Sequence, residues 1–116
     1  MITYLASPYT SDHQPTCHER YHLACKAAAI LMQQGHVVFS PIAHSHGIAR
    51  FIIDNTHALW MTQDLPFLDF AAKMVVMMLP GWEESMGIKQ EIKYARDKGI
   101  PVEYITLDDL QSTSES

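Results

Sequence analysis

The sequence predicts a single α/β domain built on a parallel sheet of about four to five strands, with helices on both faces of the sheet. Its 116 residues match the usual length of one domain. Short apolar segments alternate along the chain with segments of helical periodicity, which is the order typical of β-α-β units. The segment 74–79 is apolar at every position, as expected for a strand that helices cover on both faces.

The first expected strand is residues 3–6, and Pro8 excludes a helix directly after it. Thr16 and Glu19 have the spacing of a capping box, which predicts a helix that starts at residue 16 and ends at Gly35. The buried face of this helix is expected to consist of Tyr21, Ala24, Cys25, Ala28, Leu31 and Met32.

A second strand is expected at 36–39, and the pattern from 42 to 55 is ambiguous, with a short helix possible around residues 48–52. Asn55 or Thr56 could cap a further helix. Asp64, which precedes Leu-Pro, is typical of a new helix start.

The segment 74–79 is the third expected strand, and a helix is predicted from about Ser85 to Lys98, with Gly99 as its stop. A last strand at 102–105 and one helical turn at 107–110 complete a domain of residues 1–110. Residues 111–116 are polar and are expected to form a frayed C-terminal tail.

Three loops should meet at one edge of this sheet, because they follow its first three strands. They are Ser7–Asp12, Ser40–His46 and Pro80–Gly87. Ligands of parallel α/β sheets bind outside the carboxyl ends of the strands, so we expect the functional site among these loops.

Composition limits the possible partners. The formal charge is −5, with 8 Lys and Arg against 13 Asp and Glu, and this disfavours a protein that binds nucleic acid polymers. It leaves room for a small anion held by backbone amides. No apolar run reaches the length of a membrane span, and no signal peptide is recognisable, so we expect a cytoplasmic protein. Cys17 and Cys25 would lie ~12 Å apart on one helix, beyond disulfide reach.

The helix after the third strand carries the most informative residues. Ser85 is a plausible N-cap and Gly87 lies in the first turn, so the free amides there could bind an anion, although a cap needs no ligand. Glu91 falls at the margin of the apolar face. It could form an ion pair with Lys98 or Arg96, or serve as a nucleophile or base beside a cleft.

Two further groups have competing interpretations. Asp64 could be an N-cap, or one of two carboxylates that divide the roles of nucleophile and acid around a sugar. His44 or His46 could contact a ligand in the cleft. A metal site is the weaker alternative, because no third ligand is evident and no His-Glu-x-x-His pattern occurs. We therefore expect no metal.

Together these segments resemble the nucleoside 2-deoxyribosyltransferase superfamily, which includes nucleotide N-glycosidases and small phage and bacterial proteins. The resemblance spans nearly the whole chain. Its motifs are Tyr4-Leu5-Ala6-Ser7-Pro8-Tyr9-Thr10, Phe39-Ser40-Pro41-Ile42-Ala43-His44-Ser45-His46, Asp64, and Gly81-Trp82-(x2)-Ser85-(x)-Gly87-(x3)-Glu91-(x3)-Ala95-(x3)-Gly99-(x)-Pro101.

The resemblance implies a flavodoxin-like or Rossmann-like fold and an enzyme without a cofactor. It implies that Glu91 is the nucleophile, that Asp64 is the acid at the leaving base, and that the hydroxyl of Tyr4 steadies the nucleophile. It also implies a homodimer or higher homo-oligomer. The residues expected to bind the nucleoside or nucleotide are Ser7, Pro8, Tyr9, His44, His46, Trp82, Ser85 and Gly87.

Two departures from the family pattern bear on the substrate and on turnover. Family members that act on free nucleosides often carry an acid six residues before the nucleophile, where this chain has Ser85. A serine, unlike an acidic residue, can accommodate a 5′-phosphate together with the amides at the helix start. We therefore expect an N-glycosidase that cleaves a (deoxy)nucleoside 5′-monophosphate through a covalent ribosyl-Glu91 intermediate. Ala72-Lys73 stand where the family usually has another Asp.

Three alternatives remain. One is a deoxyribosyltransferase that acts on free nucleosides. Another, which the Ala72-Lys73 departure favours, is a catalytically silent nucleotide-binding or sensor module. A third, weaker alternative is a histidine-dependent metal hydrolase.

Overall fold

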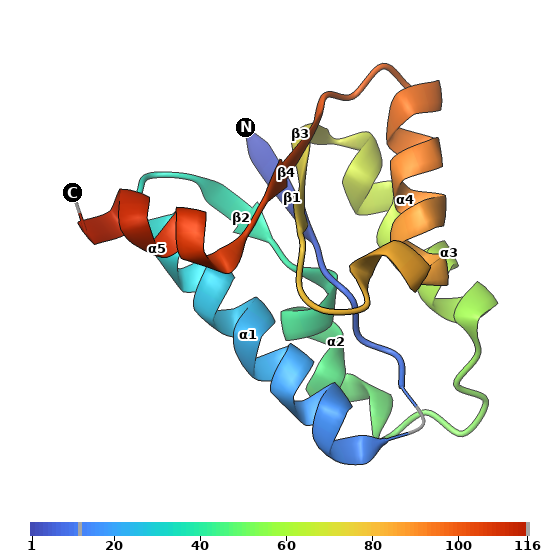
Figure 1. Ribbon diagram of the computed structural model, residues 1–116. Coiled ribbons are helices and arrows are strands. Elements are labelled where there is room, and N and C mark those ends of the chain that lie inside the picture. The colour runs from blue at the N-terminus through green and yellow to red at the C-terminus, as the bar shows by residue number, and fades with distance from the viewer. Residues whose placement is uncertain (12, 116) are drawn as a thin grey trace.

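A computed structural model describes residues 1–11 and 13–115 of the chain. Four strands form a single parallel sheet: β1 (Ile2–Ala6), β2 (Val37–Phe39), β3 (Ala71–Met77) and β4 (Val102–Ile105). The strand order is β2-β1-β3-β4, so the two strands with the most buried residues lie at the centre (Figure 1). The predicted parallel α/β sheet is confirmed.

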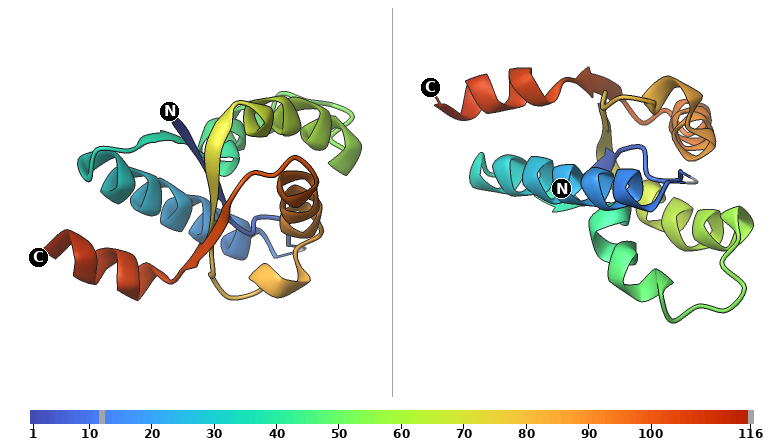
Figure 2. Two further views of the ribbon diagram at one scale, coloured as in Figure 1. Left: turned by 90° about the horizontal axis from the view of Figure 1, so that it is seen from above. Right: turned by 60° about the horizontal axis from the view of Figure 1, so that its bottom comes forward.

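Helices cover both faces of this sheet. The long helix α1 (Gln14–Gln33) and the C-terminal helix α5 (Leu107–Glu115) lie on one face, while α3 (His57–Asp69) and α4 (Met86–Asp97) lie on the other (Figure 2). Helix α2 (Pro41–Ala49) follows β2 and packs against α1 near the carboxyl ends of the strands (Figure 1). A 3-10 turn, η1 (Trp82–Glu84), leads into α4.

The side chains of β3 show why that strand is apolar at successive positions. Val75 and Met77 belong to the core on the α1 and α5 side, and Met74 and Val76 belong to the core on the α3 and α4 side. Successive side chains of a strand point to opposite faces, so both sets must be apolar when both faces are covered.

Helix α1 begins two residues before the predicted capping box. Its N-cap is His13, and Pro15 occupies the first turn, where its missing N–H costs no helical hydrogen bond. Thr16 Oγ1 lies 3.0 Å from His13 Nδ1 instead of capping the helix. The predicted buried face is also partly wrong, because Met32 is 54% exposed whereas Ala27 is fully buried.

The region that the sequence left ambiguous contains two well-capped helices. The hydroxyl of Ser40 accepts a hydrogen bond from the amide of Ala43 at 3.2 Å, so α2 starts inside the segment that we expected to be a loop. Thr56 caps α3 through the amide of Leu59, also at 3.2 Å. The predicted helix start at Asp64 is wrong, because α3 runs through it and through Pro66.

Helix α5 is longer than the single turn that the sequence predicted. Leu110 is fully buried in the core against α1 and anchors the helix, which continues to Glu115. The predicted division between a domain and a tail at residue 110 therefore falls inside a helix and stays a prediction. No helix in the described part of the chain is long and apolar enough to cross a membrane.

Candidate active site

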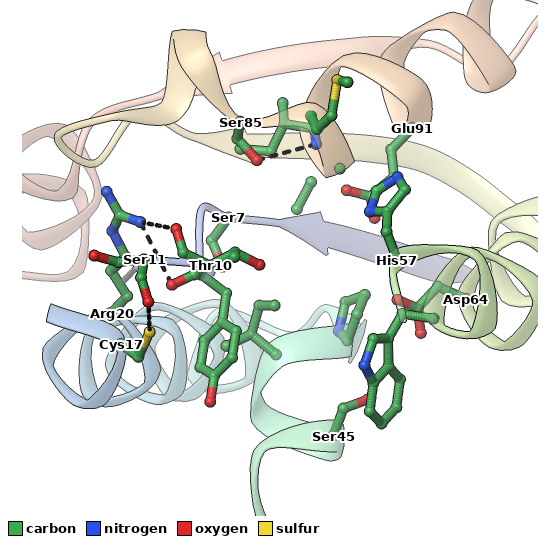
Figure 3. Close-up of a pocket in the computed structure, with 18 of the residues that line it drawn as sticks. Ser7, Thr10, Ser11, Cys17, Arg20, Ser45, His57, Asp64, Ser85 and Glu91 are labelled. Carbon is green, nitrogen blue, oxygen red and sulfur yellow. Dashed lines mark hydrogen bonds between the residues drawn. The ribbon is translucent and has the colours of Figure 1, made fainter. Parts of the chain in front are cut away.

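A cavity of about 990 Å³ opens at the carboxyl ends of the strands. Its walls come from the loop after β1, the start of α1, one side of α2 along its length, α3 as far as Asp64, and the segment 81–91 with the start of α4 (Figure 3). The three chain segments that we expected to meet do meet here. Asp12, the end of the first of them, lies outside the described residues.

Glu91, which lines this cleft, forms a buried pair with Tyr4 beneath it. Glu91 lies on α4 and is only 6% exposed, and Tyr4 lies on β1 and is fully buried. The hydroxyl of Tyr4 donates a hydrogen bond to Oε2 of Glu91. The alternative ion pairs are not formed, because Lys98 lies over the ring of Tyr94 and Arg96 bonds to the hydroxyl of Tyr104.

The surroundings of Glu91 favour its protonated form. Burial raises the pKa of the Glu91 carboxyl to about 8; the hydrogen bond from Tyr4 opposes this rise, and the negative charge of Asp64 adds to it. Burial, together with the charge of Glu91, also raises the pKa of the Tyr4 hydroxyl, so Tyr4 remains a donor. The second carboxyl oxygen, Oε1, would lie 4.0 Å from a Cβ added at Gly87, so the glycine keeps the wall beside it open.

Asp64 is a second buried carboxyl in the same cleft. It lies within α3, is 7% exposed and lines the cavity. Burial raises the pKa of Asp64 to about 6, and the electrostatic interaction with the His44 imidazole opposes this rise. The charge of Asp64 affects the pKa of Glu91, so the two carboxyls interact electrostatically. Asp64 lies inside α3, which excludes the interpretation of Asp64 as an N-cap.

The N-terminus of α4 forms the wall of the cleft next to Gly87. The hydroxyl of Ser85 accepts a hydrogen bond from the amide of Ile88 at 3.3 Å, so the predicted N-cap is confirmed. The hydroxyl hydrogen of Ser85 is still available to donate, and the first amides of a helix have no carbonyl partner within it. This wall therefore offers several donors to an anion.

The predicted ligand-binding residues are divided between the cleft and its surroundings. Ser7, Tyr9 and His46 line the cavity, as do Ser85 and Gly87. The hydroxyl of Tyr9 lies 2.7 Å from His46 Nδ1, and the ring of Tyr21 stacks on His46 at 3.9 Å. The lining does not include Pro8, His44 or Trp82.

These three residues have other surroundings. Pro8 is buried, and His44 is exposed on α2. Trp82 packs against Tyr104 at a ring distance of 5.7 Å. A role for them in binding stays a prediction.

The lining residues that were not anticipated include Arg20, His57, Trp60 and Met61. They come from α1 and α3, and only the packing of these helices over the carboxyl edge brings them to the cleft. Nε2 of His57 hydrogen-bonds with Oε1 of Gln90 at 2.5 Å, which links α3 to α4. No local pattern marks these positions in the sequence.

The departure at Ala72-Lys73 lies away from the cleft. Lys73 forms a 3.1 Å ion pair with Glu103 on β4. Lys73 lies on the same face of β3 as Val75. The opposite face of β3 carries Met74, which belongs to the same core cluster as Tyr4. No set of three or more metal-binding side chains gathers anywhere in residues 1–11 and 13–115.

Comparison with known proteins supports the fold. A family model described as a domain of unknown function (DUF1937) matches residues 1–106. A solved structure of a 2-deoxyribosyltransferase from the psychrotolerant bacterium Bacillus psychrosaccharolyticus is similar with a TM-score of 0.64 and 20% sequence identity, over 91% of this chain and 72% of that chain. No curated protein matches the sequence. The resemblance noted in the sequence is thus confirmed at the level of the fold, which is flavodoxin-like.

Proposed function

Because the chain belongs to the family described as a domain of unknown function (DUF1937), we propose its function from the residues of its cleft. We propose that it is an N-glycosidase that cleaves the bond between the base and the sugar of a (deoxy)nucleoside 5′-monophosphate. The observation that carries this proposal is the buried Tyr4–Glu91 pair beside a second buried carboxyl, Asp64. Paired carboxyls in different environments are typical of glycosidic bond cleavage.

In the empty cleft the raised pKa values place a proton on Glu91 before they place one on Asp64, so the proposed reaction begins when that proton passes to Asp64 in the substrate complex. Oε1 of the ionised Glu91 then attacks C1′ of the sugar. The C1′–N bond breaks, its electron pair passes to the base, and the carboxyl of Asp64 delivers a proton to that base. Tyr4 holds Oε2, so the attacking oxygen is the one that faces the open wall at Gly87. Water then attacks C1′ of the sugar ester and gives a proton to Asp64, which restores both carboxyls without a cofactor.

A 5′-monophosphate is the proposed substrate because of the start of α4. Ser85 and the amides of the first turn offer hydrogen bonds to an anion, and the positive end of the helix dipole adds to them. An acidic residue at position 85 would repel such a group, and the chain has none there. The similar solved structure is that of a 2-deoxyribosyltransferase, which supports a nucleoside-derived substrate.

The test is a screen of the purified protein against the common nucleosides and their 5′-monophosphates, with free base measured by chromatography. We expect base from the monophosphates and none from Glu91→Gln, which loses the attacking oxygen but keeps the shape of the side chain. Glu83→Gln is the matched control, because Glu83 is exposed on η1 and does not line the cleft.

Each other outcome identifies one alternative. Base released from free nucleosides alone, or only after a second base is added, identifies a deoxyribosyltransferase. No base from any compound identifies a binding module that does not turn over. Normal turnover by Glu91→Gln removes Glu91 from the role of nucleophile.

A further inference from the structure

We propose that Ser7 and Arg20 form the phosphate-recognition end of the cleft and decide whether the protein prefers a nucleoside 5′-monophosphate to the free nucleoside. The inference rests on the proposed function for the identity of the whole ligand. The binding of a phosphate group at this end does not depend on catalysis. Neither residue belongs to the pair of carboxyls that would cleave the bond.

Ser7 has an unsatisfied hydroxyl in the wall of the cleft. It follows β1 directly, is 5% exposed and lines the cavity. Its Oγ is the one buried side-chain oxygen or nitrogen without a hydrogen-bond partner among the residues that the structure describes. Such groups are rare in folded proteins, because a buried hydroxyl loses its bonds to water and gains nothing in return. A ligand that accepts its hydrogen bond accounts for its presence.

Arg20 supplies the positive charge. It is the only Lys or Arg among the described residues that line the cavity. Its guanidinium donates to the carbonyl of Thr10 at 2.9 Å, to that of Tyr9 at 3.4 Å and to that of Pro80 at 3.1 Å. Carbonyls fix the position of the guanidinium without neutralising its charge, and within residues 1–11 and 13–115 no carboxylate forms an ion pair with it.

The position of Arg20 fits one end of a bound nucleotide. Figure 3 shows Arg20 on the side of the cleft away from Glu91 and Asp64, with Ser7 and Ser85 in the part of the cleft between them. A sugar whose C1′ lies at Glu91 and whose base lies at Asp64 would therefore extend its 5′-substituent toward Ser7, Ser85 and Arg20.

The chemistry of these groups matches a phosphate. A phosphate monoester carries close to two negative charges and three strong acceptor oxygens, for which a hydroxyl, a guanidinium and helix amides are suitable donors. Glu84 carries a negative charge that would repel a phosphate, because it is exposed at the end of η1 and also lines the cleft next to Ser85 in the sequence. Removal of the Glu84 charge should strengthen phosphate binding, whereas removal of the Ser7 hydroxyl or the Arg20 charge should weaken it.

The experiment measures binding without turnover. Isothermal titration with 2-deoxyribose 5-phosphate and with 2-deoxyribose compares the wild type with Ser7→Ala, Arg20→Gln and Glu84→Gln. Arg50→Gln is the matched control, because it removes one positive charge from the end of α2 outside the cleft. Circular dichroism melts show whether each variant is folded.

We expect Ser7→Ala to weaken binding of the sugar phosphate by roughly 10- to 100-fold, the usual effect of a hydrogen bond to a charged group. The same variant should melt at a higher temperature than the wild type, because it removes an unsatisfied buried hydroxyl. Arg20→Gln should abolish the preference for the phosphorylated sugar, Glu84→Gln should increase it, and Arg50→Gln should leave it unchanged. If Arg20→Gln does not fold, Ser7→Ala and Glu84→Gln decide the matter.

Two results would overturn the proposal. One is a wild type that binds both sugars equally, and the other is a Ser7→Ala variant that binds the phosphate as tightly as the wild type. These results are distinct from a failure of the proposed function. A protein that binds 2-deoxyribose 5-phosphate through Ser7 but releases no base from any nucleotide would refute the glycosidase and leave the phosphate site standing.

Discussion

The carboxyl of Glu91 occupies a place where the core would favour an apolar side chain. It lies on the buried face of α4 where it meets the cleft, and among the described residues its only hydrogen bond to a side chain comes from Tyr4. A carboxylate so deeply buried costs free energy unless it takes up a proton. The raised pKa of Glu91 expresses that cost.

Glu91→Gln should therefore stabilise the protein in a way that depends on pH. A carboxyl whose pKa is about 8 when folded, against 4.5 when unfolded, holds a proton in the folded state that the unfolded state releases between those values. The stability of the wild type falls as pH rises through this range. We expect Glu91→Gln to gain almost nothing at about pH 4.5 and roughly 2–4 kcal/mol at about pH 8. Urea unfolding at several pH values measures the difference.

Asp64→Asn distinguishes the contributions of the two carboxyls to the pH dependence of stability in the same experiment. The pKa of Asp64 is about 6, so its replacement should give a gain that is complete at a lower pH than the gain from Glu91→Gln. A Glu91→Gln variant with the same stability difference at every pH would show that folding does not raise the pKa of Glu91.

The residues of the site differ in how far the sequence could place them. Glu91 was found because helical periodicity puts it at the edge of an apolar face, where a carboxylate is unusual. Asp64 was harder to interpret, since Asp before Leu-Pro is also typical of a helix start. Arg20 could not be found, because its contacts are carbonyls of residues 9, 10 and 80, and these depend on the tertiary fold.

At the scale of the elements, the turn that leads into α4 depends on a glycine. Gly81 has φ of 92°, and a Cβ there would lie 2.4 Å from Nη2 of Arg20. The guanidinium is the end of a flexible side chain, so it would move and give up its hydrogen bond to the carbonyl of Pro80. This turn and α1 are thereby coupled.

Gly81→Ala should cost more stability than Gly99→Ala. Both glycines have positive φ, which disfavours alanine by about 1–2 kcal/mol, but a Cβ at Gly99 meets no atom within 4 Å. Gly81→Ala should lose roughly a further 0.5–1 kcal/mol through the displaced Arg20, because the hydrogen bond that Arg20 gives up is exposed to solvent. Chemical denaturation of the two variants measures this. Equal losses would show that Arg20 contributes nothing to the turn.

The elements that the sequence predicted well are those with a strong local signal. The helix α4, with Ser85 and Gly99 at its ends, and β4 lie close to the predicted bounds, and β3 overlaps the predicted strand but starts three residues before it. Helices α2 and α3 were missed in part because they contain Pro41 and Pro66 and mix apolar and polar residues around the whole helix. Their extent is set by the caps at Ser40 and Thr56 and by packing against the sheet.

At the scale of the whole molecule, large exposed apolar side chains gather in the chain between α2 and the end of α3. Ile53 is 98% exposed and Phe70 is 80% exposed, and Phe51 lies under the guanidinium of Arg50 at 4.7 Å. Single exposed apolar residues are ordinary, but several within one short stretch of chain suggest a contact surface. The homo-oligomer expected from the family resemblance remains a prediction.

Sedimentation of the purified chain tests that prediction. We expect at least a dimer at micromolar concentration, and a shift toward the monomer in the double variant Phe51→Ser with Ile53→Ser. Phe70→Ser, on the far side of α3 in the sequence, shows whether the surface extends that far. A monomeric wild type at all concentrations would contradict the prediction.

The unsatisfied hydroxyl of Ser7 and the enclosed carboxyl of Glu91 have a consequence for anyone who engineers this protein. Both groups lower the stability of the empty fold, so the substitutions that remove them are expected to raise its melting temperature. A directed-evolution campaign that selects only for survival after heating would enrich such substitutions first. Its most heat-resistant variants would neither bind the ligand nor catalyse the reaction, so each round needs a selection for binding or turnover as well.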